Sequence, residues 1–135
     1  MGILDRLKRR REFLIVASQG RKWAAAGLIL QARPHQPADP DAAAAPAASR
    51  VGFTVSRKVG NAVARNRARR RLKAAAEAVM PTQARAAYDY VLIGRQQTMT
   101  RPFPALLQDL ETALRKTGAH VSSKDNADGE KSRRA

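Results

Sequence analysis

The sequence contains no cysteine. This excludes disulfide bonds, zinc sites built on thiolates and thiol nucleophiles, and with them several enzyme classes. No stretch approaches the roughly 20 consecutive apolar residues that a membrane-spanning helix needs. The opening residues, MGILDRLKRRREF, also lack the apolar run that follows the basic residues of a signal peptide. We therefore expect a cytoplasmic protein without a membrane span.

Acidic residues are scarce as well. The chain of 135 residues has 11 Asp and Glu against 26 Lys and Arg, a formal net charge of +15. This charge predicts a polyanionic partner, with nucleic acid as the first candidate and an anionic membrane surface as the second. Some of these acids lie in two low-complexity segments, so the folded part is poorer still in acids. The acids in the two segments are Asp39, Asp41, Asp125, Asp128 and Glu130.

The length allows one domain with a modest core. Residues 33–49, RPHQPADPDAAAAPAAS, are rich in Pro, Ala and Asp and have no periodicity, and the C-terminal residues are polar with mixed charge. We predict one domain over residues 1–116 with a flexible insertion at 33–49. A disordered basic and polar tail should follow at 117–135.

Between these segments the pattern predicts helix, strands, helix, strand and helix. Near the N-terminus, Phe13 and Ala17 lie one helical turn apart, and Gly20 is placed to end the helix. Residues 22–32, KWAAAGLILQA, have a strand-like apolar end, although their alanines leave the first half ambiguous. Pro102 can open a last helix with a leucine-rich stripe.

Two further segments have strand patterns. Residues 50–56, RVGFTVS, alternate apolar with small or polar side chains, as a half-buried strand does. Residues 88–94, YDYVLIG, form the short apolar run that is typical of a buried strand.

Residues 62–80 should form one helix of about five turns, because Asn61 is a suitable N-cap and Pro81 a suitable stop. At 100° per residue one sector of this helix is apolar and rich in alanine. Small side chains let the helix lie close to the sheet. The members of this stripe are Ala64, Ala68, Leu72, Ala75 and Val79.

The opposite side of this helix is cationic. Residues 64–73, ARNRARRRLK, hold six cationic side chains in ten positions and no acid. Across this side lie Arg67, Arg69, Arg70 and Lys73 with Asn66 among them, whereas Arg65 and Arg71 project near the flanks of the apolar stripe.

A charged helical face is often only a solvated surface, but solvated faces usually mix signs. Here Arg65 and Arg69 form a like-charged pair at four-residue spacing, and so do Arg69 and Lys73. Each such pair destabilises the helix by a few tenths of a kcal/mol. The predominance of arginine favours a phosphate partner, because the guanidinium group bonds two oxygens at once. Arg57 and Lys58 extend this basic surface upstream.

The stretch SRKVGNAVARNRARRRLK, residues 56–73, resembles the signature of the bacterial ribonuclease P protein subunit. The flanks agree, since RLKRRREFLIV followed by Gly20 resembles the opening helix of that family and DYVLIGR resembles its last strand. The resemblance covers about residues 6–115 and leaves 33–49 as an unusual insertion.

The resemblance implies a function. The family's protein binds a large catalytic RNA, and the ribonucleoprotein removes the 5′ leader from precursor transfer RNA. The expected partners are therefore this catalytic RNA subunit and precursor transfer RNA, with no obligate protein partner. The protein would be a noncatalytic subunit that binds no cofactor by itself, because Mg²⁺ ions held by RNA and substrate phosphates perform the chemistry.

The resemblance also implies two sets of site residues, with no catalytic and no metal-binding residue among them. Residues expected to bind the RNA subunit are Arg65, Asn66, Arg67, Arg69, Arg70 and Lys73. A cleft between the first helix and the sheet would hold the single-stranded leader, next to Phe13, Ser56, Arg57, Lys58, Asn61 and Arg95.

The fold implied is α+β, a single-domain α/β sandwich of the class that includes the second domain of a ribosomal protein. It has a mixed sheet of about four strands, the fourth expected from splitting residues 22–32, and a left-handed βαβ crossover, against the usual right-handed rule. Ala17 and Gln31 stand where the family commonly places aromatics. The cleft should therefore offer less stacking surface, worth about 1–3 kcal/mol per base. Arg71 stands where many members are apolar.

Other functions remain open at this stage. A general architectural nucleic-acid-binding protein fits the charge equally well. A stand-alone nuclease needs clustered carboxylates or a positioned pair of histidines, but His35 and His120 lie in the predicted loop and near the tail. A membrane-surface helix needs bulky apolar residues opposite its charge, and here they are mostly alanine. Phe13 could belong to the core or stack on the leader, and Trp23 is interpreted as a packing residue.

Overall fold

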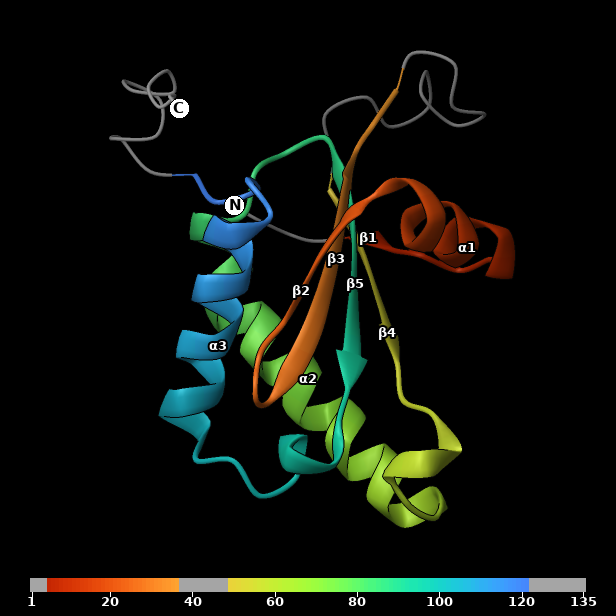
Figure 1. Cartoon of the computed structure of the whole chain (residues 1–135), viewed down its shortest axis with the longest axis vertical. Helices are drawn as coiled ribbons and strands as arrows, with labels where there is room; N and C mark the ends of the chain where they lie inside the picture. The colour runs from red at the N-terminus through yellow and green to blue at the C-terminus, as the bar shows by residue number, and fades with distance from the viewer. Residues whose placement is uncertain (1–4, 37–48, 122–135) are drawn as a thin grey trace.

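The structure, a computed structural model, describes residues 5–36 and 49–121. Its strands form one mixed sheet in the order β1-β4-β5-β3-β2 (Figure 1). β1, β4 and β5 are parallel to one another, and β3 is antiparallel to both β5 and β2. The bounds are β1 (Asp5–Arg6), β2 (Arg21–Ala24), β3 (Leu28–Pro34), β4 (Arg50–Thr54) and β5 (Tyr88–Gly94).

The predicted α+β fold with a mixed sheet is confirmed. The expected fourth strand comes from residues 22–32, which divide into β2 and β3 at a turn where the N–H of Ala25 donates to the carbonyl of Leu28. Two-residue β1 adds a short fifth strand at the edge of the sheet next to β4.

Helices cover both faces of the sheet. The α-helices are α1 (Arg10–Gln19), α2 (Ala62–Gln83) and α3 (Phe103–Lys116), and two short 3-10 helices are η1 (Arg57–Val59) and η2 (Gln96–Thr98). In Figure 1, α2 lies behind the sheet, and β5 lies to the left of β4 with both strands running downward. The β4-α2-β5 crossover is therefore left-handed, as the resemblance implied.

The main core lies between the sheet and the pair α2 and α3. Side chains alternate along each strand, so one set of alternate residues faces these helices. The fully buried members include Leu30 of β3, Leu92 of β5, Leu72 of α2 and Leu110 of α3. A smaller cluster under α1 contains Leu7, Val16 and Val91, with Phe13 and Ile93 packed against it.

The predicted stop of α2 at Pro81 is wrong, because the helix continues through Pro81 to Gln83. A proline inside a helix lacks the N–H that would bond four residues back. Here the loss falls in the last turn, and the neighbouring Val79 and Met80 are fully buried against the core. Packing therefore outweighs the local signal.

The insertion predicted at 33–49 is structured at both ends. Arg33 and Pro34 belong to β3, and the N–H of His35 donates to the carbonyl of Ala87 at 2.8 Å. The hydroxyl of Ser49 donates to the carbonyl of Arg85. Residues 37–48 lie outside the described part of the chain.

The first residues of the predicted tail pack on the domain. Thr117 and Ala119 are buried, and the N–H of Val121 donates to the carbonyl of Gln83 at 2.7 Å. The rest of that prediction, residues 122–135, lies beyond the described residues. Across the described ranges, no helix has the length and apolar character needed to cross a membrane.

Candidate RNA interface

The start of α2 is set by local polar contacts. The Asn61 carboxamide oxygen accepts the N–H of Ala64 at 2.9 Å, which confirms Asn61 as the N-cap. Just upstream, the hydroxyl of Ser56 accepts the N–H of Lys58 and caps η1. Gly60 has φ +155°, and a β-carbon there would lie 2.9 Å from Cβ of Ala64. Glycine is therefore needed where the chain turns from η1 into α2.

The cationic face of α2 points away from the core. Ala68, Leu72 and Ala75 of the predicted apolar stripe are fully buried. On the opposite side of α2, all six residues predicted to bind the RNA subunit are exposed or half-buried. The exposed ones are Asn66, Arg67, Arg70 and Lys73, and the half-buried ones are Arg65 and Arg69.

Two of these arginines are held by neighbours on the same surface. Nη1 of Arg65 donates to the carbonyl of Gly60 at 3.0 Å, and Nη1 of Arg69 donates to the carboxamide oxygen of Asn66 at 3.2 Å. Both partners are neutral, so neither contact offsets the positive charge.

No carboxylate in the described ranges pairs with a cation of α2. The ion pairs found there include those of Arg50 with Glu12 and Asp89, and of Arg101 with Asp109. The like-charge repulsion along α2 is thus not compensated by these parts of the fold.

Arg71 differs from its neighbours on α2. Its guanidinium group is half-buried and donates to the carbonyls of Met99 and Arg101, just after η2. The prediction that Arg71 projects near the flank of the apolar stripe is confirmed. The group holds α2 against this segment, so it does not belong to the outward cationic face.

The residues predicted to surround the leader gather at one end of the sheet. Ser56 and Arg57 follow β4 and Arg95 follows β5, and the carboxyl ends of these parallel strands meet at the same edge. The side-chain amide of Gln96 donates to the carbonyl of Lys58 at 3.2 Å and ties the two segments together. The predicted residues Ser56, Arg57, Lys58, Asn61 and Arg95 are all exposed.

Phe13 does not lie at this edge. It lies on the face of the sheet that α1 covers. It projects from α1, is half-buried and packs on Gly52 of β4. Beyond Gly52 on that side, Thr54 pairs with Ile93, which also pairs with Ile29. Thr54 is exposed and both isoleucines are half-buried, so a partly apolar surface leads from Phe13 toward the cationic edge.

Sequence reasoning missed Ile29 and Ile93 as members of this surface. Alternation in YDYVLIG carries the necessary signal, because Val91 and Ile93 must face the same side. Gln31 pairs with Val91 and so lies on this side, and Ala17 is exposed on α1. Gln31 therefore lies on the face of the sheet where the resemblance would have placed an aromatic.

An ion-pair network fixes α1 over the sheet. Arg50 of β4 donates from Nε and Nη2 to the two carboxylate oxygens of Asp89 on β5, and from Nη1 to Oε2 of Glu12 on α1. Burial pushes the pKa of Glu12 up, but the N–H groups of Arg9 and Lys8 together with Arg50 hold that pKa below its ordinary value.

Both histidines in the described residues bond a neighbouring side chain. His35 is not part of a loose loop, because its Nε2 lies 2.8 Å from Oδ1 of Asp89, and His120 bonds the carboxamide of Gln83. No group of three or more potential metal ligands is found across residues 5–36 and 49–121.

Trp23 was interpreted from the sequence as a packing residue. In the structure 37% of its surface is exposed, and the ammonium group of Lys116 lies 5.4 Å from the centroid of its ring.

Comparison with known proteins agrees with this arrangement. A sequence profile described as Ribonuclease P matches residues 1–118. The chain is 58% identical over 116 residues to the ribonuclease P protein component of Paramagnetospirillum magneticum, which covers 86% of this chain and 84% of that protein. It is 50% identical over 113 residues to the ribonuclease P protein component of Gluconacetobacter diazotrophicus, covering 84% of this chain and 90% of that protein.

A solved structure shares the fold. The RNase P protein from Staphylococcus aureus matches with a TM-score of 0.68 at 21% identity, over 88% of this chain and 100% of that chain. The profile match and the identities, together with a fold that places the arginine-rich helix on its surface, show that the chain belongs to the ribonuclease P protein family.

Proposed function

We propose that this chain is the RNA-binding, noncatalytic protein component of a cytoplasmic ribonuclease P, which removes the 5′ leader of precursor transfer RNA. Family membership supports the role as a subunit. One observation carries the proposed RNA contact: the cationic face of α2 has no carboxylate partner in the described ranges.

In this proposal α2 lies along phosphates of the catalytic RNA. Arg67 and Arg70 are exposed and suited to bidentate bonds with phosphate oxygens, and Lys73 adds a point charge one turn farther along. Contacts of this kind supply affinity that falls with salt and carry little sequence information.

The leader would lie on the sheet surface beside α1. Phe13 offers a ring for a base to stack on, and Arg57, Lys58 and Arg95 offer cations for the phosphates beyond it. Mature transfer RNA has lost the leader, so a protein that holds the leader distinguishes the precursor from the product.

The protein would supply no catalytic group. Three of the carboxylates it could offer are bonded to guanidinium groups: Glu12 and Asp89 to Arg50, and Asp109 to Arg101. We assign the cleavage chemistry to Mg²⁺ ions held by the catalytic RNA and by substrate phosphates.

The test is reconstitution. Purified protein is mixed with a bacterial catalytic RNA and a precursor transfer RNA at low magnesium, and leader release is compared with that of the RNA alone. We expect a clear rise in rate, and no rise would overturn the proposal. Protein incubated with the precursor alone is the control, since cleavage there would indicate a stand-alone nuclease. Binding without stimulation would indicate a general nucleic-acid-binding protein.

A further inference from the structure

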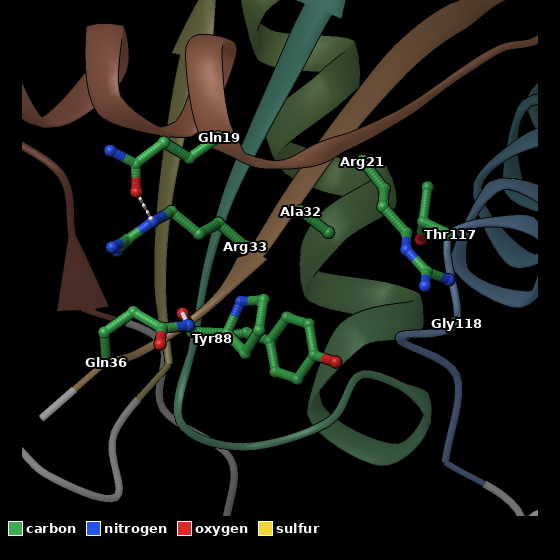
Figure 2. Close-up of a pocket in the computed structure, with 9 residues that line it drawn as sticks. Gln19, Arg21, Ala32, Arg33, Gln36, Tyr88, Thr117 and Gly118 are labelled. Atoms are coloured by element: carbon green, nitrogen blue, oxygen red, sulfur yellow. Dashed lines mark hydrogen bonds between the residues drawn. The ribbon is translucent and has the colours of Figure 1, made fainter.

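A pocket of about 480 Å³ lies beside the ends of α1 and β3 (Figure 2). Pro34 and Tyr88, which line it, pair with each other at one end of the β3-β5 ladder. The other end of that ladder is the pair of Leu28 and Gly94, directly before Arg95. The pocket and the predicted leader edge therefore lie at opposite ends of the sheet.

The pocket exists because an edge strand ends early. The pairing of β2 with β3 ends at Arg21 and Ala32, so Arg33 and Pro34 extend past it without a partner strand on that side. Gln19 at the end of α1 and Gly118 after α3 form the neighbouring walls. Figure 2 shows Arg33 and Arg21 on the two sides of Ala32, with the ring of Tyr88 below.

The charge of the pocket favours an anion. Two arginines are among its described lining residues, exposed Arg21 and buried Arg33, and none of these described residues is a carboxylate. Nε of Arg33 donates to the carboxamide oxygen of Gln19 at 3.0 Å, which fixes the direction of that guanidinium group. Figure 2 shows this group turned toward Gln19, so the exposed guanidinium group of Arg21 is the one suited to a phosphate.

Carbonyl groups at the end of α3 could oppose an anion, since a helix C-terminus carries partial negative charge. Here several of them already have donors. The hydroxyl of Thr117 donates to the carbonyls of Ala113 and Leu114, and Nε of Arg85 donates to the carbonyl of Gly118.

Tyr88 adds an aromatic surface of fixed orientation. Its ring is stacked on Tyr90 with centroids 5.6 Å apart and planes 15° apart. Tyr90 is fully buried, and its hydroxyl donates to the carbonyl of Arg85 at 2.6 Å. A ring held in this way needs little ordering before a base stacks on it, and every base has a face to stack.

We infer that this pocket binds one nucleotide of single-stranded RNA, with its base against Tyr88 and its phosphate at Arg21. The volume is within the usual range for small-ligand pockets. The inference rests on the proposed function, which makes RNA the expected ligand. The nucleotide could come from the catalytic RNA or from the leader of the precursor, because both offer the same chemistry.

Two titrations of the full chain test this inference and separate the two sources. In the first, Arg21→Ala and Tyr88→Leu proteins are titrated into catalytic RNA alone. In the second, precursor and mature transfer RNA are titrated into holoenzymes assembled at saturating protein. Matched controls are Arg115→Ala, which removes an exposed cation outside the pocket, and Tyr88→Phe, which keeps the ring.

We expect Arg21→Ala and Tyr88→Leu to weaken one of these affinities by about fivefold or more, the lower end of the range for base stacking. A loss in the first titration assigns the nucleotide to the catalytic RNA. A loss for the precursor but not for mature transfer RNA assigns it to the leader.

The inference is overturned if Arg21→Ala matches Arg115→Ala, and Tyr88→Leu matches Tyr88→Phe, in both titrations. Thermal unfolding shows whether the Tyr88→Leu protein still folds. If it does not, the comparison of Arg21→Ala with Arg115→Ala, two substitutions of exposed residues, decides the outcome. Failure of the proposed function is recognised separately. In that case the unaltered protein binds neither RNA, or Arg67→Ala with Arg70→Ala leaves affinity for the catalytic RNA unchanged.

Discussion

The ring of Phe13 lies directly on Gly52, where a β-carbon would stand 2.5 Å from both Cε2 and Cζ of that ring. Any side chain at position 52 would push the ring off β4. Phe13 is therefore a packing residue, and its half-exposed side is available for the stacking on a base that the proposed function requires.

Phe13→Ala should lower the affinity of the holoenzyme for precursor transfer RNA and leave mature transfer RNA unaffected. The loss of one stacked base corresponds to about 1–3 kcal/mol, or about 5- to 150-fold in affinity. Equilibrium binding of both RNAs measures this. Gly52→Ala keeps the ring but displaces it, and should produce a smaller loss of the same kind. Equal losses for precursor and mature RNA would mean that Phe13 is only structural.

Replacing Arg67 and Arg70 by Ala should weaken assembly with the catalytic RNA and reduce its salt dependence. Each lost phosphate contact lowers the slope of log K against log salt by about 0.7–0.9. Affinities at several salt concentrations give this slope. Arg71→Ala is the matched control, since it removes the same charge from the same helix but from a group bonded to the carbonyls of Met99 and Arg101. A slope unchanged by the double substitution would remove Arg67 and Arg70 from the interface.

The stability of the fold should fall in acid partly through Glu12. Its pKa is lowered in the folded protein, so its contribution is fully present above the ordinary value of 4.5 and is lost as pH falls through the lowered value. Glu12→Gln should therefore lower the free energy of unfolding at neutral pH, and its difference from the unaltered protein should shrink below about pH 4.5. Urea unfolding across this range measures the difference.

Exposed Glu77 provides the control for this experiment. Glu77→Gln makes the same change of charge away from Arg50, and should change the free energy of unfolding at neutral pH by less than about 0.5 kcal/mol. A difference between Glu12→Gln and the unaltered protein that stays constant with pH would contradict the role given to Glu12.

Asp109→Asn should destabilise the joint between α3 and the β2-β3 turn. Its Oδ2 accepts the N–H of Gly27 at 3.0 Å and Nε of Arg101 at 2.7 Å, and the residue is 8% exposed. Loss of a buried charged acceptor lowers the free energy of unfolding by about 1–3 kcal/mol. Gln108→Ala, on the exposed side of the same helix, should change it by less than about 0.5 kcal/mol. Similar losses for the two variants would argue against the bonded role of Asp109.

Local patterns in the sequence predicted most of the elements. RVGFTVS alternates because Val51 and Phe53 face α2, whereas Gly52 and Thr54 face α1, where Phe13 packs. The spacing of alanines in α2 likewise predicted which side of the helix would be buried. These features depend on side-chain periodicity alone, so no distant residue was needed to recognise them.

What the sequence did not show depends on contacts between distant segments. The two residues of β1 form a strand only because β4 lies beside them. Pro81 stays helical because Val79 and Met80 are buried by the rest of the domain. Arg50 meets Asp89 only through the register of β4 and β5, and no local pattern indicates that pairing.

The central position of β5 affects how the chain reaches its native state. Before Tyr88–Gly94 is synthesised, β1 with β4 and β2 with β3 are separate strand pairs, and nothing joins them into one sheet. The arginine-rich helix precedes β5 in the chain, so it leaves the ribosome before one of the two strands of the sheet that it contacts. Productive folding must therefore wait for the last third of the protein, and until then a strongly cationic, unshielded segment is exposed to the RNA-rich surroundings of translation.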